Sequence, residues 1–447
     1  MIDRELASKT IQMALDRGAS DAECTLSEGE EFSASVRMRS LETLKDAGSR
    51  GAGLRVLVGH RVGSSYTSDM SSEGIRKLVE SAIEIAAISS EDPFAGLPDP
   101  SELGSLAGDL GLYSEDIHKV STSQRIEQAL QTEEAALSAD PRITNSEGAS
   151  FDAYSGERVF ANSRGFIGSY RTSSCSLSTT PVAREGDSME RDYWFSSARS
   201  HAKLESPEAI GKRAAERTLR RLGARKAATQ KVPVVFDPQM ARTLIGDIFE
   251  AVEGDAIYRK ASFLAGKLGQ RVASELVTIV DDGTIPGLFG TSPFDDEGAP
   301  SRRTVVIERG VLRSYLLNSY TARKLGLKTT GNAARGITGN ASVGHGNLFL
   351  ENGDRTPESI IHGIRNGLYV TELIGSGVNI VTGDYSRGAA GLWIENGEFA
   401  YPVSEITIAS NLAHMLMDIE AKGSDLEFRG SVASPTLVIR EMTVSGQ

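Results

Sequence analysis

Two loop segments in the second half of the 447-residue chain concentrate the side chains that can do chemistry. The first segment, 292–303, holds three consecutive carboxylates, Asp295, Asp296 and Glu297. Arg302 follows them across a predicted turn. Paired carboxylates can serve general acid–base catalysis, but three at adjacent positions point in different directions and commonly cap turns or bind arginine. We therefore expect either a structural role or a surface that faces a peptide or a partner.

The second segment, 377–391, places Tyr385 and Arg387 among glycines and other small residues. A loop of this composition can hold an extended peptide through main-chain hydrogen bonds and an aromatic face. Turn formation alone uses the same residue types. Both interpretations stay open, and Tyr385 and Arg387 join the candidates that face a peptide or a partner.

Local motifs for metal, nucleophile or nucleotide chemistry are missing from the sequence. No two of the six histidines lie within five residues of each other, and neither HExxH nor HExxxH occurs. Helical zinc sites need two imidazoles about one turn apart. There is no GxSxG or GxxxxGK[ST] motif, and Cys24 and Cys175 lie in strand-like sequence that favours inert thiols. A metal site assembled from residues far apart in the sequence stays open, but we expect no cofactor and no metal in this chain.

Composition and charge narrow the classes of partner. Hydrophobic residues make up 39% and charged residues 24% of the chain, values typical of a folded protein. The net charge of −12 disfavours nucleic acid and anionic membranes. No apolar run approaches the roughly 18 residues that span a bilayer, and residues 1–20 read as an amphipathic helix, not as a signal peptide. We expect a cytoplasmic protein without a membrane or nucleic-acid partner.

The periodicity of apolar residues predicts an α+β fold with two domains. Residues 1–225 alternate between helical spacing and the two-residue period of antiparallel strands, which predicts an N-terminal α+β domain. Residues 231–447 read as many short strands with a few helices, which predicts a β-rich domain, either barrel-like or a sandwich. Asn396-Gly397 between two strand patterns indicates a two-residue hairpin.

Four stretches resemble the TldD/PmbA family, and specifically its PmbA (TldE) branch. These stretches are SPFDDEGAPSRRT (292–304), GDAIYRKASFLAGKLG (254–269), TGDYSRGAAGLWIENG (382–397) and YPVSEITIASNL (401–412). The resemblance runs over essentially the whole chain. It implies a cytoplasmic protease in which a TldD-type subunit pairs with a PmbA-type subunit and acts on unfolded or small peptides. It also implies that the TldD-type subunit carries zinc on an HExxxH motif, with a Cys ligand near its C-terminus.

The sequence departs from that family's catalytic pattern at the positions that would hold zinc. Aligning 244–254 with the motif puts Phe249 at the first His, Glu250 at the general-base Glu and Gly254 at the second His. No His lies between His201 and His345, so no shift of the alignment restores the motif. Residues 423–435, where the Cys ligand would fall, contain no Cys. Without imidazole or thiolate ligands, Glu250 has no metal-bound water to deprotonate.

Two functions from different classes follow. The first is a non-catalytic subunit that closes the cleft of a TldD-type zinc subunit and positions an unfolded peptide. The second is an autonomous peptidase with a site outside these motifs, such as His345 with Asp295 and Asp296. A dimer is expected in both cases, and the chain alone can form a two-fold homodimer. Membership of a metallopeptidase family does not decide between them, because fold does not fix the chemistry of a site.

Overall fold

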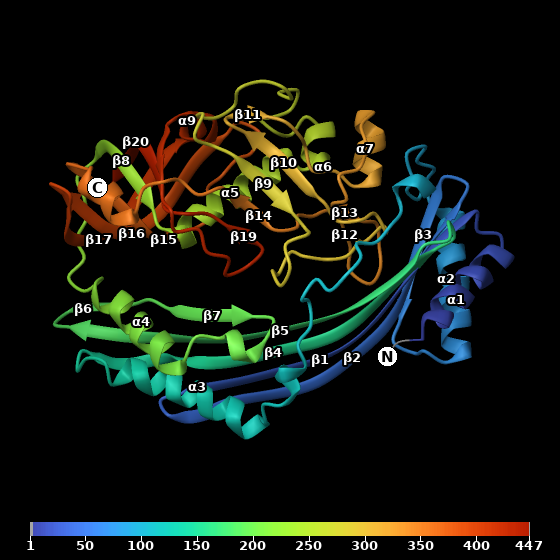
Figure 1. Cartoon of the computed structure of the whole chain (residues 1–447), viewed down its shortest axis with the longest axis horizontal. Helices are drawn as coiled ribbons and strands as arrows, with labels where there is room; N and C mark the ends of the chain where they lie inside the picture. Colours follow the sequence, from blue (N-terminus) through green and yellow to red (C-terminus); the bar gives the residue numbers. More distant parts are fainter. Residues whose placement is uncertain (1–2, 447) are drawn as a thin grey trace.

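A long curved sheet forms the first half of the chain, and the second half lies against it (Figure 1). The computed structural model describes residues 3–446. The elements of the first half are α1 (Arg4–Asp16), β1 (Asp21–Arg37), β2 (Ser40–Val58), β3 (Arg61–Thr67), α2 (Ser72–Ile88), α3 (Thr122–Leu137), β4 (Ile143–Asn162), β5 (Ile167–Glu185), β6 (Ser188–Arg191), β7 (Trp194–Ala198) and α4 (Pro207–Leu219). Within the described range, the seven antiparallel strands have the order β3-β2-β1-β4-β5-β6, with β7 beside β5.

The two faces of this sheet differ because side chains alternate along each strand. One face of β1 carries the buried even-numbered residues Cys24, Leu26, Phe32, Ala34 and Val36. Helices α1 and α2 cover this face at one end, and α3 and α4 cover it at the other. The odd-numbered residues of β1 lie on the opposite face, toward the second half of the chain. The predicted domain of antiparallel strands with helices is confirmed.

The second half closes into a barrel. Its helices and longer strands are β8 (Gln230–Phe236), α5 (Pro238–Val252), α6 (Gly254–Tyr258), β9 (Ile279–Asp282), β10 (Arg303–Glu308), α7 (Ser319–Leu325), α8 (Pro357–His362), β15 (Asn366–Ile374), β16 (Asp384–Glu395), β17 (Glu398–Asn411), α9 (Leu412–Met417), β18 (Ile419–Lys422) and β20 (Leu437–Ser445). In the part of the chain that is described, β17, β16, β15, β8 and β20 pair in that order, and a further pairing of β17 with β20 closes the ring. Of the two predicted forms, barrel-like and sandwich, the structure therefore has the barrel.

Short strands form a second sheet beside the barrel. It contains β11 (Val311–Leu312), β14 (Leu348–Leu350) and β19 (Val432–Ala433) together with β9 and β10, while β12 (Ala333–Ala334) and β13 (Ser342–Val343) lie outside it. The sheet has the order β11-β10-β9-β14-β19, and β12 pairs with β13 separately. Helix α5 packs in the core that the barrel and this sheet share. Its apolar stripe is fully buried there and comprises Leu244, Ile245, Ile248, Ala251 and Val252.

One predicted turn is confirmed and one predicted loop is wrong. Asn396 and Gly397 join β16 to β17 with φ of 52° and 85°, the positive values that a two-residue hairpin turn requires. The glycine-rich segment 377–391, by contrast, becomes strand β16 from Asp384 onward, because these residues pair with β17. Tyr385 and Arg387 therefore lie on a strand of the barrel and not in a loop.

A buried group of charges joins the two halves. Glu23 on β1 has a side chain that is 1% exposed, and its carboxylate forms an ion pair with Arg335 of the second half. Arg55 on β2 lies 3.1 Å from the same carboxylate and donates from Nε to Oδ1 of Asn340. Burial raises the pKa of Glu23, but the guanidinium groups of Arg335 and Arg55 outweigh it and hold the pKa below its usual value.

The connection between the halves runs through residues 220–229. Arg225 in this stretch bridges to Val403, and its guanidinium lies over the ring of Tyr401 at 3.4 Å from the centroid. The division into residues 1–225 and 231–447 stays a prediction. None of the helices in residues 3–446 is both long enough and apolar enough to cross a membrane.

Removing the buried carboxylate of Glu23 should lower the stability of the protein more than removing an exposed carboxylate that also forms an ion pair. Glu23→Gln leaves two buried guanidinium groups without their carboxylate, so we expect the free energy of unfolding to fall by about 3 kcal/mol. The matched control is Glu208→Gln, whose partner Lys212 lies at 2.6 Å on the exposed surface of α4, and its stability should stay close to that of wild type. Urea unfolding at pH 7 measures both.

The pH dependence of the same pair follows from the lowered pKa of Glu23. A carboxyl whose pKa is lower in the folded state stabilises the fold above its unfolded pKa, and this stabilisation is lost as the pH falls through the folded-state pKa. The difference between wild type and Glu23→Gln should therefore shrink in acid. A difference that stays constant down to pH 2 would contradict this account.

Candidate functional site

The residues that the sequence aligned with a zinc motif lie at the end of α5 and the start of α6. The side chain of Asp237 begins α5 by accepting from the backbone N–H of Met240 at 2.8 Å. Phe249 meets the ring of His345 edge-on, with 4.8 Å between the ring centroids. The side chain of Glu250 is exposed. An aromatic ring therefore occupies the space beside the nearest imidazole.

Gly254, the position aligned with the second His, is tightly enclosed. A Cβ atom at this position would lie 2.4 Å from Oγ1 of Thr321 and 2.9 Å from Cδ2 of Leu317. Real Cβ atoms do not approach other atoms so closely, and an imidazole needs still more room. Within residues 3–446, no group of three or more His, Cys, Asp or Glu side chains is placed to hold a metal ion. These residues do not fit the zinc that the family implies.

A polar cavity of about 310 Å³ lies close to this region, between the curved sheet and the second sheet. It gathers Asp295, Asp296 and Arg302 from the predicted loop with His345. Asp281 of β9 also lines it and was missed by the sequence analysis. The only sequence signal for Asp281 is its position at the end of a strand pattern, which does not distinguish it from any other strand-end carboxylate.

The adjacent carboxylates of the loop point in different directions, as expected. Asp295 is buried and accepts hydrogen bonds from the backbone N–H groups of Glu297, Ala299 and Ala333 at 2.9–3.0 Å. Burial together with the charge of Glu297 raises the pKa of Asp295 to about 7, against the opposing effect of these donors. Asp296 binds Arg158 at 2.9 Å. Both carboxylates thus hold backbone and arginine in place.

The side chain of Glu297 points away from this cavity and lines a different one. Its Oε2 accepts from the backbone N–H of Ser319 at 2.9 Å, at the start of α7. Burial raises its pKa. It lines a separate cavity of about 410 Å³ together with Arg55 and Tyr258. The three predicted carboxylates are therefore not one site.

Asp281 and His345 of the polar cavity can each form a further hydrogen bond. Asp281 accepts from Nδ2 of Asn332 at 2.7 Å, and burial raises its pKa to about 6. His345 uses Nδ1 toward the carbonyl oxygen of Gly346 at 2.9 Å, which leaves Nε2 for a further partner. A buried carboxyl with a raised pKa and an imidazole with a free ring nitrogen, both lining one cavity, can exchange protons with a bound molecule.

Tyr385 and Arg387 lie elsewhere, at the start of β16. Tyr385 is 1% exposed and belongs to the barrel core, so the prediction that it faces a peptide or a partner does not fit its position. Alternation on the strand turns it inward, a direction that a loop assignment could not reveal. Arg387 donates to the carbonyl oxygen of Gly375 at 3.1 Å. Its charge also acts on Asp247 of α5, a half-buried carboxyl that sequence reasoning missed.

Comparison with known proteins now identifies the family. Models of three PmbA/TldA metallopeptidase domains match the chain: domain 1 over residues 22–86, the central domain over 115–222 and the C-terminal domain over 229–446. The chain belongs to the PmbA/TldA metallopeptidase family. It is 40% identical over 447 residues to metalloprotease PmbA of Escherichia coli O157:H7, covering 99% of this chain and 97% of that protein. The resemblance seen in the sequence is confirmed.

A further relative and two solved structures agree with this assignment. A PmbA homolog of Haemophilus influenzae is 37% identical over 443 residues and covers 99% of this chain and 96% of its own. A solved structure from Bacteroides thetaiotaomicron, described as a candidate modulator of DNA gyrase, superposes with a TM-score of 0.92 at 30% identity, covering 99% of both chains. TldE of Thermococcus kodakarensis shares the fold, with a TM-score of 0.87 at 23% identity over 99% of this chain and 100% of that chain.

The enclosure of Gly254 predicts opposite effects for two glycine substitutions. Gly254→Ala should lower the free energy of unfolding by about 1–3 kcal/mol, because the added methyl group overlaps Thr321. Gly246 lies within α5 with nothing within 4 Å of the added Cβ, so Gly246→Ala should raise stability by about 1 kcal/mol. Urea unfolding of the two variants checks both signs. Equal stabilities would mean that position 254 has room for a side chain.

The raised pKa of Asp247 leads us to expect that stability changes with pH. Partial burial raises the pKa of Asp247 to about 7, and its Oδ2 finds no hydrogen-bond partner among residues 3–446. A carboxyl whose pKa is raised by folding costs stability as it ionises, so this cost develops between about pH 4 and pH 7. Asp247→Asn should therefore be more stable than wild type at pH 8 by about 2 kcal/mol, and the gain should vanish at pH 4. Urea unfolding at the two values tests this, and a gain independent of pH would contradict it.

Proposed function

We propose that this chain is a non-catalytic subunit of a cytoplasmic zinc metalloprotease heterodimer that acts on unfolded or small peptides. The observation that carries the proposal is the absence of any His between His201 and His345 in a chain that belongs to a metallopeptidase family. The enclosed position of Gly254 supports it, since no imidazole fits there. The chain's role is to enclose and position the peptide for a catalytic partner.

The partner in this proposal is a TldD-type subunit, which supplies the zinc. A TldD homolog of Haemophilus influenzae is 25% identical to this chain over 427 residues, covering 89% of this chain and 87% of that protein. Two related chains of similar length can form a pseudo-symmetric pair, and the chain alone can use the same surface in a homodimer. Cys24 and Cys175 are both buried free thiols, which suits a reducing cytoplasm.

The polar cavity favours one alternative function, an autonomous peptidase. Asp281 and His345 share this cavity with Asp295, and burial raises the pKa of both aspartates, to about 6 for Asp281 and about 7 for Asp295. A metal or a water activated by these groups would make the chain catalytic by itself. In that case His345→Gln should abolish both the activity and any bound metal.

Native mass spectrometry of the protein isolated from its own host distinguishes the two functions. The proposal predicts a complex with a second chain and one zinc, together with a zinc-free isolated chain. His345→Gln serves as the variant control and should leave that complex and its zinc unchanged. A zinc-loaded homo-oligomer that cleaves peptides would overturn the proposal and support the autonomous peptidase.

A further inference from the structure

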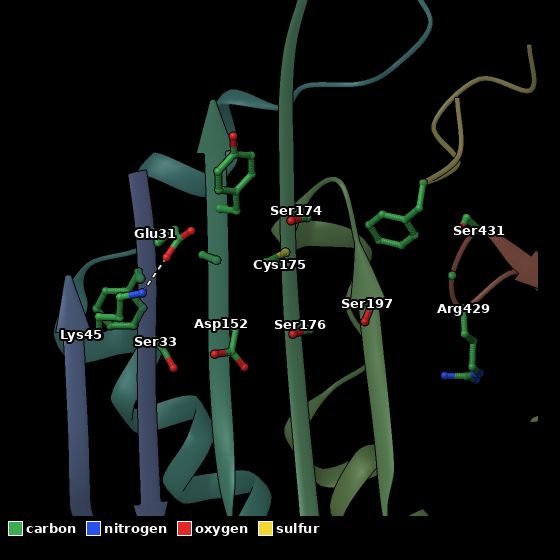
Figure 2. Close-up of a pocket in the computed structure, with 15 residues that line it drawn as sticks. Glu31, Ser33, Lys45, Asp152, Ser174, Cys175, Ser176, Ser197, Arg429 and Ser431 are labelled. Carbon is green, nitrogen blue, oxygen red and sulfur yellow. Dashed lines mark hydrogen bonds and ion pairs between the residues drawn. The ribbon is translucent and has the colours of Figure 1, made fainter. Parts of the chain in front are cut away.

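A row of small polar side chains crosses the curved sheet on the face that its helices leave free. Lys45, Ser33, Asp152, Ser176 and Ser197 lie opposite one another on β2, β1, β4, β5 and β7. Figure 2 shows these residues at one level across the neighbouring strands. The adjacent rows on the same face are also polar, and they contain Glu31, Tyr154 and Ser174 on one side and Ser35, Ser150 and Ser178 on the other.

This polar row forms the floor of a groove of about 820 Å³. Phe289 and residues 429–431 of the second half also line this groove. Figure 2 shows Arg429 and Ser431 across from the strands of the sheet. The opposite face of the same strands holds Phe151 and Leu177 against α3 and α4. The apolar face is therefore buried against helices as part of the core. Residues of the second half extend over the polar face, but they leave the groove between them and the sheet open.

Two arginines fix these residues of the second half to the sheet. Arg199 donates to the carbonyl oxygens of Leu288 and Phe289 at 3.1 and 2.9 Å. Arg429 donates to the carbonyl oxygen of Phe195 at 2.8 Å. The width of the groove is thus set by hydrogen bonds between the two halves, which reduces the entropy that a ligand must lose on binding.

In the described part of the chain, each charged side chain that lines the groove forms an ion pair, except for Asp152. Lys45 pairs with Glu31 at 2.7 Å, and Arg429 pairs with Glu205 at 2.7 Å. Within residues 3–446, Asp152 accepts a hydrogen bond from the hydroxyl of Ser150 at 3.0 Å and forms no ion pair. An unpaired carboxylate in a half-buried groove favours a cation and disfavours phosphate or carboxylate ligands.

We infer that this groove binds an extended peptide and places a Lys or Arg side chain of that peptide against Asp152. Serine hydroxyls both donate and accept, so a row of them can satisfy the N–H and C=O groups of an extended backbone whatever its sequence. Five strands about 4.8 Å apart span about 19 Å, the length of about six extended residues. The inference rests on the proposed function, because it names the peptides that this subunit positions.

Binding of short labelled peptides to the full-length chain tests the inference. The probes are nine-residue glycine–serine peptides with blocked ends and a fluorescein label, carrying either Lys or norleucine at the centre. Fluorescence anisotropy should show that the Lys peptide binds about fivefold more tightly. Asp152→Asn should abolish this preference and leave the norleucine peptide unaffected. Asp187→Asn, which removes an exposed carboxylate at the β5–β6 turn, should retain it.

A second variant blocks the groove without changing its charge. Ser176→Tyr fills the middle of the polar row and should weaken both peptides at least tenfold. Equal affinity of the wild-type chain for the two peptides would overturn the inference, and so would unchanged binding by Ser176→Tyr. Loss of peptide binding when the partner subunit is added would also overturn it, since a partner segment would then occupy the groove.

The outcomes separate this inference from the proposed function. Pairing with the partner and its zinc content are read by native mass spectrometry, which is independent of the anisotropy measurement. A zinc-containing complex without Lys preference overturns the groove assignment alone. A zinc-loaded homo-oligomer overturns the non-catalytic role, whatever the peptides show.

Discussion

The buried contact of Glu23 with Arg55 and Arg335 is the interaction on which the relation of the two halves depends. The carboxylate comes from β1 and one guanidinium from β2, while the other comes from a loop of the second half. Each charge is removed from water and is acceptable only in the presence of the others. The contact therefore ties the curved sheet to the second half near one end of the interface, while Arg158, Arg199 and Arg429 join the halves at other places.

The curved sheet uses its two faces for different purposes. Cys24, Leu26 and Phe32 alternate with Glu23, Glu31 and Ser33 along β1, so one face becomes a helix-covered core and the other stays polar. A polar face gains little from being packed, and part of it can remain open even though the second half contacts the sheet elsewhere through arginines and through Phe294. The polar face thus forms one side of a groove, with side chains at the regular spacing of paired strands. Hydrogen bonds from Arg199 and Arg429 hold the other side in place.

The region aligned with the zinc motif keeps the family fold with side chains that do not fit a metal ion. Helix α5 remains in the core that the barrel and the second sheet share, because its apolar stripe is buried there. Phe249 packs on His345 and Gly254 on Thr321, so the space that imidazoles need is taken by ordinary packing. Fold and family membership thus constrain the architecture more strongly than the chemistry.

The sequence alone determined the α+β class, the hairpin at Asn396-Gly397 and the family, because alternation, turn chemistry and motifs are local properties. It also determined that the zinc motif is missing. Only the tertiary structure decided that Tyr385 is buried, that Glu297 leaves the cavity of Asp295, and that Asp281 joins His345. The row from Lys45 to Ser197 is equally invisible in the sequence, since strand register is set by pairing between segments more than a hundred residues apart.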